Sequence, residues 1–334
     1  MAGENERRLR VCAPAEPGAR RCEMSKRTLA VLAVITTTII WGSTFALVKI
    51  VLAEIPPFTL ALLRFALASF ILLPIVHLNP AWRIGWRNLE WRRLSAMGFL
   101  GVTLYFVTEN LGMVYTTASS GSLVTAGAPA ITAVFAVVFL KERLGWVRSL
   151  GIAISMVGVA IIVLAGGQGD VYSPNPLLGN LLICGSSVCW GFYTIWGKDM
   201  NRRYPDMTIT AWTIALGTIW LLPFAAYEWV TQGLGAISAT SWLIVGFLGV
   251  AASAAAYVLW NYALSHLDAS VTATFLNLVP VVSLLLAGTV LAERIRPIQI
   301  VGGVLVMGGV YLASRLPTST EPGVDVTGLE ELTP

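Results

Sequence analysis

Three charged side chains lie inside long apolar stretches of the sequence: Lys49, Arg64 and Glu109. A charge within hydrocarbon is costly, so each of them is by default a functional hypothesis. Arg64 and Glu109 lie six or seven residues from one end of their stretches, roughly 10 Å deep at helical rise. They could form a static ion pair that locks two helices, with Lys49 joining from the mouth. Alternatively, Arg64 or Glu109 binds a charged group of a small molecule, or Glu109 carries a proton.

Aromatic and amide side chains are the other polar or half-polar groups in these stretches. We predict that seven of them line a cavity: Trp41, Trp190, Tyr105, Asn110, Tyr257, Asn261 and Asn277. Tryptophans concentrate at membrane interfaces, whereas Trp41 and Trp190 lie near mid-depth. They either pack between helices or form a cavity wall that stacks on a ligand or blocks an exit. The amides either join helices or contact that ligand, because a buried amide needs a partner.

Two prolines, Pro129 and Pro280, fall about halfway along two of the apolar stretches. Proline removes an amide donor and clashes with the preceding turn, which kinks a helix and frees a carbonyl. In lipid, a freed carbonyl is tolerated where it is buried in protein or lines a cavity. The kinks therefore serve packing alone, or they form a gating bend whose backbone faces the ligand.

Repeated glycines and glutamates give two further predictions. The glycines lie two turns apart and suit close helix packing: Gly151 with Gly158, and Gly302 with Gly309. Glu142 and Glu293 each precede an arginine at the end of an apolar stretch. We interpret them as local interfacial ion pairs, with a gating role as the alternative.

The sequence lacks the residues that a metal site or a catalytic centre needs. Its two histidines, His77 and His266, have no second ligand at helical spacing, and its four cysteines form no cluster. Glu109 is the one carboxylate well inside an apolar stretch, so acid–base chemistry lacks its second group. We predict no metal, no cofactor and no enzyme activity; the alternative is an intramembrane enzyme acting on a lipid-soluble substrate.

The elements that must position these residues are membrane helices. The chain has 334 residues, of which 56% are hydrophobic and 12% charged, against about 25% charged in soluble domains. A span needs ~20 apolar residues. Ten stretches qualify: 28–51, 58–77, 95–116, 119–140, 149–166, 177–198, 209–230, 241–263, 270–292 and 298–315. We predict an all-α integral membrane protein with disordered cytoplasmic tails over 1–27 and 316–334.

Charge placement predicts the orientation. Lysines and arginines concentrate in alternate connectors, such as the one with Arg83 and Arg87, whereas the opposite connectors hold only Arg294 and Arg296. By the positive-inside rule, both termini are cytoplasmic in a multi-pass plasma (inner) membrane protein. Because the basic residues form no continuous face, nucleic acid is not a predicted partner.

The two halves of the sequence repeat each other in order. Matching residues recur 148 to 151 positions apart: Trp41-Gly42 and Trp190-Gly191, the pentapeptide at 98–102 and at 246–250, Ala118-Ser119 and Ala269-Ser270, Pro129 and Pro280, and Glu142-Arg143 and Glu293-Arg294. Each half, 28–166 and 167–315, has five predicted spans, and an odd number inverts the second copy. Inverted repeats build a midplane site that rocking of the halves opens to alternate sides.

This succession resembles the EamA-type carriers of the drug/metabolite transporter superfamily over about residues 25–315. The resemblance rests on the five-plus-five layout, the Trp-Gly pairs and the succession of Ala-Ser, proline and Glu-Arg in each half. It implies a secondary transporter with a central cavity, and family members often export amino acids, metabolites or drugs. We therefore expect alternating-access transport, in the efflux direction, of a small organic metabolite such as an amino acid or a related amphiphile.

Overall fold

The computed structural model describes residues 17–141, 145–164, 173–200, 202–233, 235–264, 266–267 and 275–314. Within these ranges the chain is helical and forms no β-sheet. The α-helices are α1 (Pro17–Val51), α2 (Pro57–Leu78), α3 (Trp91–Gly98), α4 (Tyr105–Tyr115), α5 (Ala118–Thr125), α6 (Ala128–Leu140), α7 (Trp146–Leu164), α8 (Pro176–Met200), α9 (Asp206–Thr231), α10 (Ala239–Phe247), α11 (Ala256–Leu264), α13 (Leu278–Thr289) and α14 (Pro297–Ser314). The same ranges hold 3₁₀-helices η1 (Trp86–Asn88) and η4 (Phe275–Asn277), and π-helical segments η2 (Phe99–Leu104) and η3 (Leu248–Ala255).

Eight helical stretches in the described ranges are long and apolar enough to cross a membrane, as predicted for a multi-pass helical protein. They cover Lys26–Val51, Pro57–Leu78, Trp91–Tyr115, Ala118–Phe139, Trp146–Leu164, Pro176–Gly197, Asp206–Thr231 and Ala239–Ala263. The predicted spans 270–292 and 298–315 match two shorter apolar helices, Phe275–Thr289 and Pro297–Ala313. Both predicted spans reach into residues outside the described ranges, so the count of ten stays a prediction.

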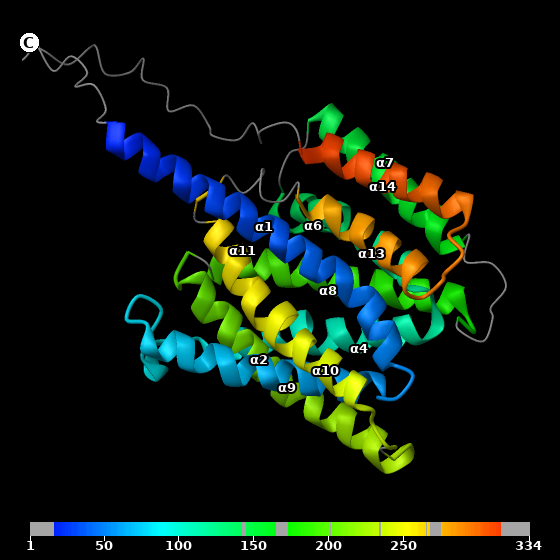
Figure 1. Cartoon of the computed structure of the whole chain (residues 1–334). Helices are drawn as coiled ribbons and strands as arrows, with labels where there is room; N and C mark the ends of the chain where they lie inside the picture. Colours follow the sequence, from blue (N-terminus) through cyan, green and yellow to red (C-terminus); the bar gives the residue numbers. More distant parts are fainter. Residues whose placement is uncertain are drawn as a thin grey trace, which may run out of the picture.

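The helices of the two halves pack in matching pairs. α1 contacts α11 and α13, and α8, its counterpart in the predicted repeat, contacts α4 and α6. α2 also pairs with its counterpart α9, and α7 with α14. Figure 1 shows α7 and α14 side by side at one edge of the bundle and α2 and α9 toward the opposite edge. Each of these contacts is thus matched by one with the halves exchanged.

The predicted glycine packing is confirmed between α7 and α14. A Cβ added at Gly158 would lie 2.7 Å from the carbonyl oxygen of Gly302, and one at Gly151 would lie 2.7 Å from that of Gly309. The two backbones therefore approach so closely that only a hydrogen atom fits at these positions. Such small-residue contacts hold helices together where the hydrophobic effect gives little preference for protein over lipid.

The repeated pentapeptide marks a π-helical segment in both halves. η2 follows directly on Gly98, and η3 begins two residues after Gly246. A π-helix widens the turn, shifts the register of the side chains that follow and recurs at functional sites. Each segment leads at once to a tyrosine, Tyr105 at the start of α4 and Tyr257 in the first turn of α11.

Pro129 lies where the helical stretch Ala118–Phe139 is interrupted for two residues between α5 and α6, and its role as a kink stays a prediction. α5 ends at Thr125 and α6 begins at Ala128, which places Pro129 in the first turn of a new helix. The missing amide proton costs little in a first turn, because it would have no intrahelical partner there. Pro280 likewise lies in the first turn of α13, directly after η4.

We predict that Gly158→Ala lowers the thermal stability of the purified protein in detergent. The added methyl group would meet the backbone of α14, and overpacking costs about 1–3 kcal/mol. Gly308→Ala is the matched control, because a Cβ there meets no described atom within 4 Å and alanine favours helix. Intrinsic fluorescence should report a melting temperature for Gly158→Ala at least about 3 °C below that of the control. Equal melting temperatures would show that the glycine contact is dispensable.

Candidate functional site

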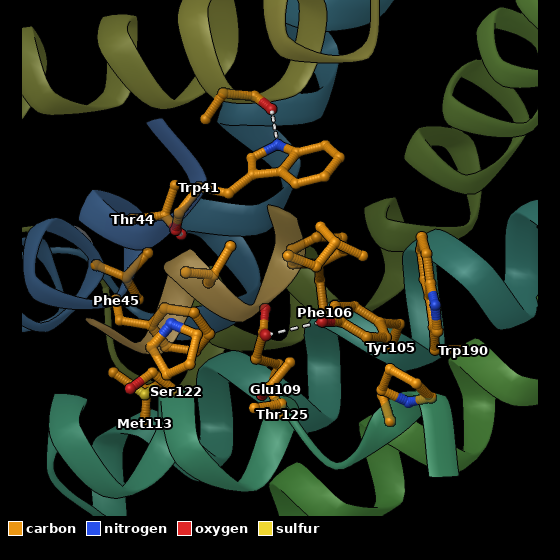
Figure 2. Close-up of a pocket in the computed structure, with 18 of the residues that line it drawn as sticks. Trp41, Thr44, Phe45, Tyr105, Phe106, Glu109, Met113, Ser122, Thr125 and Trp190 are labelled. Atoms are coloured by element: carbon orange, nitrogen blue, oxygen red, sulfur yellow. Dashed lines mark hydrogen bonds between the residues drawn. The ribbon is translucent and has the colours of Figure 1, made fainter. Parts of the chain in front are cut away.

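A cavity of about 250 Å³ lies between the helices of the two halves. It brings together ten of the twelve predicted site residues: Trp41, Arg64, Tyr105, Glu109, Asn110, Pro129, Trp190, Tyr257, Asn277 and Pro280. The other two, Lys49 and Asn261, do not line it. Figure 2 shows the labelled side chains of Trp41, Glu109 and Trp190 around this space. A functional role for these residues stays a prediction.

Aromatic side chains form crossed pairs in the cavity wall. The ring of Trp41 lies 5.7 Å from that of Tyr257 in the other half, and the ring of Trp190 lies 5.8 Å from that of Tyr105. The indole N–H of Trp41 donates to the carbonyl oxygen of Ala252, 3.1 Å away in η3. Each half thus presents its tryptophan to the tyrosine that follows the π-helical segment of the other half.

Sequence reasoning missed several lining residues. Trp260 lies 5.4 Å from Trp41 by ring centroids, one turn after Tyr257, so its spacing could have placed it on the same helix face. Thr44 and Thr125 also line the cavity. Nothing distinguishes these threonines in the sequence, because threonine side chains in apolar helices commonly bond the preceding turn.

Arg64 is buried between two aromatic rings. Its side chain is 5% exposed, and its guanidinium carbon lies 4.9 Å from the ring centroid of Phe65 and 4.8 Å from that of Phe106. Its Nε donates to the hydroxyl of Ser253 at 3.0 Å. Cation–π contacts of this kind stabilise a desolvated guanidinium and fix the plane of its fork.

Glu109 is 9% exposed and accepts a hydrogen bond from the Tyr105 hydroxyl at 2.9 Å. Both residues lie on α4, one turn apart. Among the described residues, no ion pair within 4.0 Å joins Glu109 to Arg64, although their charges act on each other across the cavity. The structure therefore does not contain the direct, static ion pair that was one of the two interpretations of Arg64 and Glu109.

Lys49 binds the end of a helix and not the charge cluster to which it was assigned. Its ammonium donates to the carbonyl oxygens of Met113 at 2.7 Å and Thr116 at 2.6 Å, where α4 ends. Helix C-termini attract cations because their last carbonyls lack intrahelical partners. The cavity is therefore left with Arg64 and Glu109 as its two charges among the described residues.

The predicted amides divide between the cavity and helix packing. Asn110 donates through Nδ2 to the carbonyl oxygen of Pro57 at 3.0 Å, but its buried Oδ1 has no partner, and neither has Oγ1 of Thr125. Asn277 lines the cavity, whereas Asn261 bonds its own helix through Nδ2 to the Tyr257 carbonyl at 2.9 Å. Asn110 and Thr125 thus each keep a buried acceptor without a partner beside the cavity.

Two glutamates of the second half cap helices of the first half, and we name them the carboxylate caps. Glu228 accepts from the backbone N–H groups of Phe58 and Thr59 at 2.9 and 2.7 Å, at the start of α2. Glu293 accepts from those of Ala118 and Ser119 at 2.8 and 3.0 Å, at the start of α5. The hydroxyls of Thr59 and Ser119 complete the same pattern. Anions are stabilising at helix N-termini, where amide donors lack partners.

The local pairing predicted for Glu293 with Arg294 is therefore wrong, because the carboxylate reaches across to the other half instead. Glu142 and Arg143 lie outside the described residues. Sequence reasoning missed Glu228, since it has no glutamate counterpart in the first half. Within the described ranges, no three His, Cys, Asp or Glu side chains lie close enough together to hold a metal ion.

The apolar helices are those of a multi-pass membrane protein, and a partly open cavity lies between them. The chain belongs to the EamA-like transporter family, whose profile matches residues 28–164 and again residues 177–315. This confirms the family that the sequence resembles. The protein is thus a transporter.

Similar proteins agree with this assignment. The chain is 32% identical to an uncharacterized transporter of Archaeoglobus fulgidus over 87% of its own length and 98% of that protein. It is 30% identical to a probable terminal-alkyne amino-acid exporter of Streptantibioticus cattleyicolor over 87% and 95%, and 27% identical to a probable amino-acid metabolite efflux pump of Salmonella typhimurium over 82% and 91%. A crystal structure with 20% identity shares the fold, with a TM-score of 0.60 over 85% of this chain and 95% of the other.

We predict that Glu228→Gln loosens the start of α2. The amide keeps one acceptor but turns an N–H₂ group toward donors, so a buried amide loses its bond at a cost of about 1–3 kcal/mol. Hydrogen–deuterium exchange of the amides of Phe58 and Thr59 should accelerate about tenfold. Glu90→Gln, which removes an exposed ion pair with Arg203, should leave this exchange unchanged. Wild-type exchange in Glu228→Gln would contradict the capping role.

Proposed function

We propose that the protein is a secondary transporter that exports a small organic amphiphile, such as an amino acid or a related metabolite. The observation that carries this proposal is the cavity, which combines one arginine, one glutamate, asparagine and threonine side chains with tryptophan and tyrosine walls. Sites for small amphiphiles are mostly apolar with a few placed polar groups. The names of two relatives, a probable amino-acid exporter and a probable amino-acid metabolite efflux pump, support the substrate class and the direction.

The proposed mechanism is alternating access by two inverted five-helix repeats, 28–166 and 167–315, with ten spans and both termini in the cytoplasm of the inner membrane. Three observations support it: the two family matches, the helix contacts that recur with the halves exchanged, and the cavity between the halves. The carboxylate caps join the halves at the end where α2 and α5 begin. In the proposed mechanism, these bonds break when the cavity opens at that end.

Filling the cavity should block transport without unfolding the protein. Thr44→Phe places a ring in the cavity, whereas Leu32→Phe on the same helix replaces a side chain that is 54% exposed on the bundle surface. In proteoliposomes loaded with a panel of amino acids and related amphiphiles, we expect saturable efflux from wild type and Leu32→Phe. Efflux should fall more than about tenfold in Thr44→Phe, because the ligand volume is occupied. Saturable flux that survives in Thr44→Phe would place the substrate path elsewhere.

The inverted repeat predicts opposite membrane faces for the connectors after α6 and after α13. Gly145→Cys and Arg294→Cys, each in a background with the four native cysteines replaced by serine, probe these exposed connectors. An impermeant maleimide on intact cells should label position 294 and should label position 145 only after permeabilisation. Labelling of both positions from one face would overturn the inverted topology.

A further inference from the structure

We propose that the cavity recognises a zwitterion, with Arg64 binding its anionic group and Glu109 its cationic group in the same complex. This inference rests on the proposed transport of a small amphiphile and specifies its charge state. We further infer that the cavity binds singly charged analogues more weakly, because Arg64 and Glu109 do not bond each other and each needs its own partner. The grounds are the unused bonding capacity of each group and the charge balance of the cavity.

Most N–H donors of Arg64 form no hydrogen bond with a described residue. Of the five N–H donors in a guanidinium, one is used, since Nε bonds Ser253 and no other described residue accepts from Arg64. The rings of Phe65 and Phe106 pack on the group, so a partner must approach at the edge. The residue is 95% buried yet lines the cavity, so a ligand in the cavity can supply a further partner. A carboxylate fits a guanidinium edge with two parallel hydrogen bonds.

Glu109 lies among acceptors that lack donors. Oε1 accepts a hydrogen bond from the Tyr105 hydroxyl, whereas no described residue donates to Oε2. Asn110 and Thr125 line the same cavity, and their Oδ1 and Oγ1 atoms are buried without a hydrogen-bond partner. An ammonium group has three donors and no acceptor. A ligand amine therefore matches this side of the cavity as a carboxylate matches Arg64.

Charge balance turns this match into selectivity. Arg64 and Glu109 both line the cavity, and neither bonds the other, since their hydrogen bonds go to Ser253 and Tyr105. A zwitterion compensates both, whereas an amine alone leaves Arg64 without an anion and a carboxylate alone leaves Glu109 without a cation. An uncompensated charge in a desolvated site is strongly unfavourable. The aromatic wall of Trp41, Tyr257 and Trp260 then receives an apolar side chain of the ligand.

The test compares three probes of one shape: L-leucine, 3-methylbutylamine and 4-methylpentanoate. The cavity tryptophans give a binding signal in detergent that does not depend on transport. Wild type should bind L-leucine at least about tenfold more tightly than either analogue. Equal affinities, tighter binding of a singly charged probe, or no binding of L-leucine would each overturn the inference. Saturable flux of an uncharged or singly charged solute in the liposome panel would then still support the transport function.

Two substitutions should change which of the three probes binds most tightly. Arg64→Gln leaves Glu109 as the sole charge and should favour the amine over L-leucine, whereas Glu109→Gln should favour the carboxylate. Arg64→Lys keeps the positive charge, so L-leucine should still bind more tightly than the two analogues. Its affinity should fall, because lysine cannot form the two parallel hydrogen bonds of a guanidinium. Glu90→Gln, an exposed position outside the cavity, is the control and should bind as wild type does. If Arg64→Gln does not fold, Arg64→Lys and Glu109→Gln still test the proposal. An unchanged order of the three probe affinities in Glu109→Gln would contradict it.

Discussion

Hydrocarbon offers no hydrogen-bond partner, so every charge and every open backbone group inside this bundle has to find one within the protein. The chain meets this constraint mainly at helix ends. Lys49 serves the last carbonyls of α4, and the carboxylate caps serve the first amides of α2 and α5. These bonds hold the positions of the helices that carry the cavity residues. The geometry of the site therefore depends on how the ends of its helices are satisfied.

Within the cavity the same constraint is met only in part. Arg64, Glu109 and Asn110 are buried, and each has one bond where its chemistry allows more. Buried groups that remain partly open are costly unless something else completes them. The three residues gather around one partly open space beside aromatic walls, whereas α7 and α14 meet through glycine and apolar side chains.

The sequence predicted the fold class and most of the cavity because the bilayer simplifies the problem. Long apolar runs identify helices, and a repeated order of residues identifies matching positions. A polar group in such a run faces the interior of the bundle or a cavity. Trp41 and Trp190 could thus be assigned to one wall in advance. The partners of Lys49, Glu228 and Glu293 could not, because they depend on which helix end lies opposite, and no local pattern encodes that distance. The π-helical segments escaped prediction because their residues, mainly glycine, alanine and leucine, also suit an ordinary helix.

The placement of the two cavity charges has a consequence for how the protein diversifies. Arg64 and Glu109 come from α2 and α4, both in the first half, while Tyr257 and Trp260 in the second half are aromatic. Both charged residues of the cavity thus lie in the first half, whereas aromatic residues of both halves line it. Under the proposed function, mutational drift in residues 177–315 would change the shape of the cavity and leave its two charged residues in place. The charge preference and the shape preference for the ligand would then be able to evolve separately.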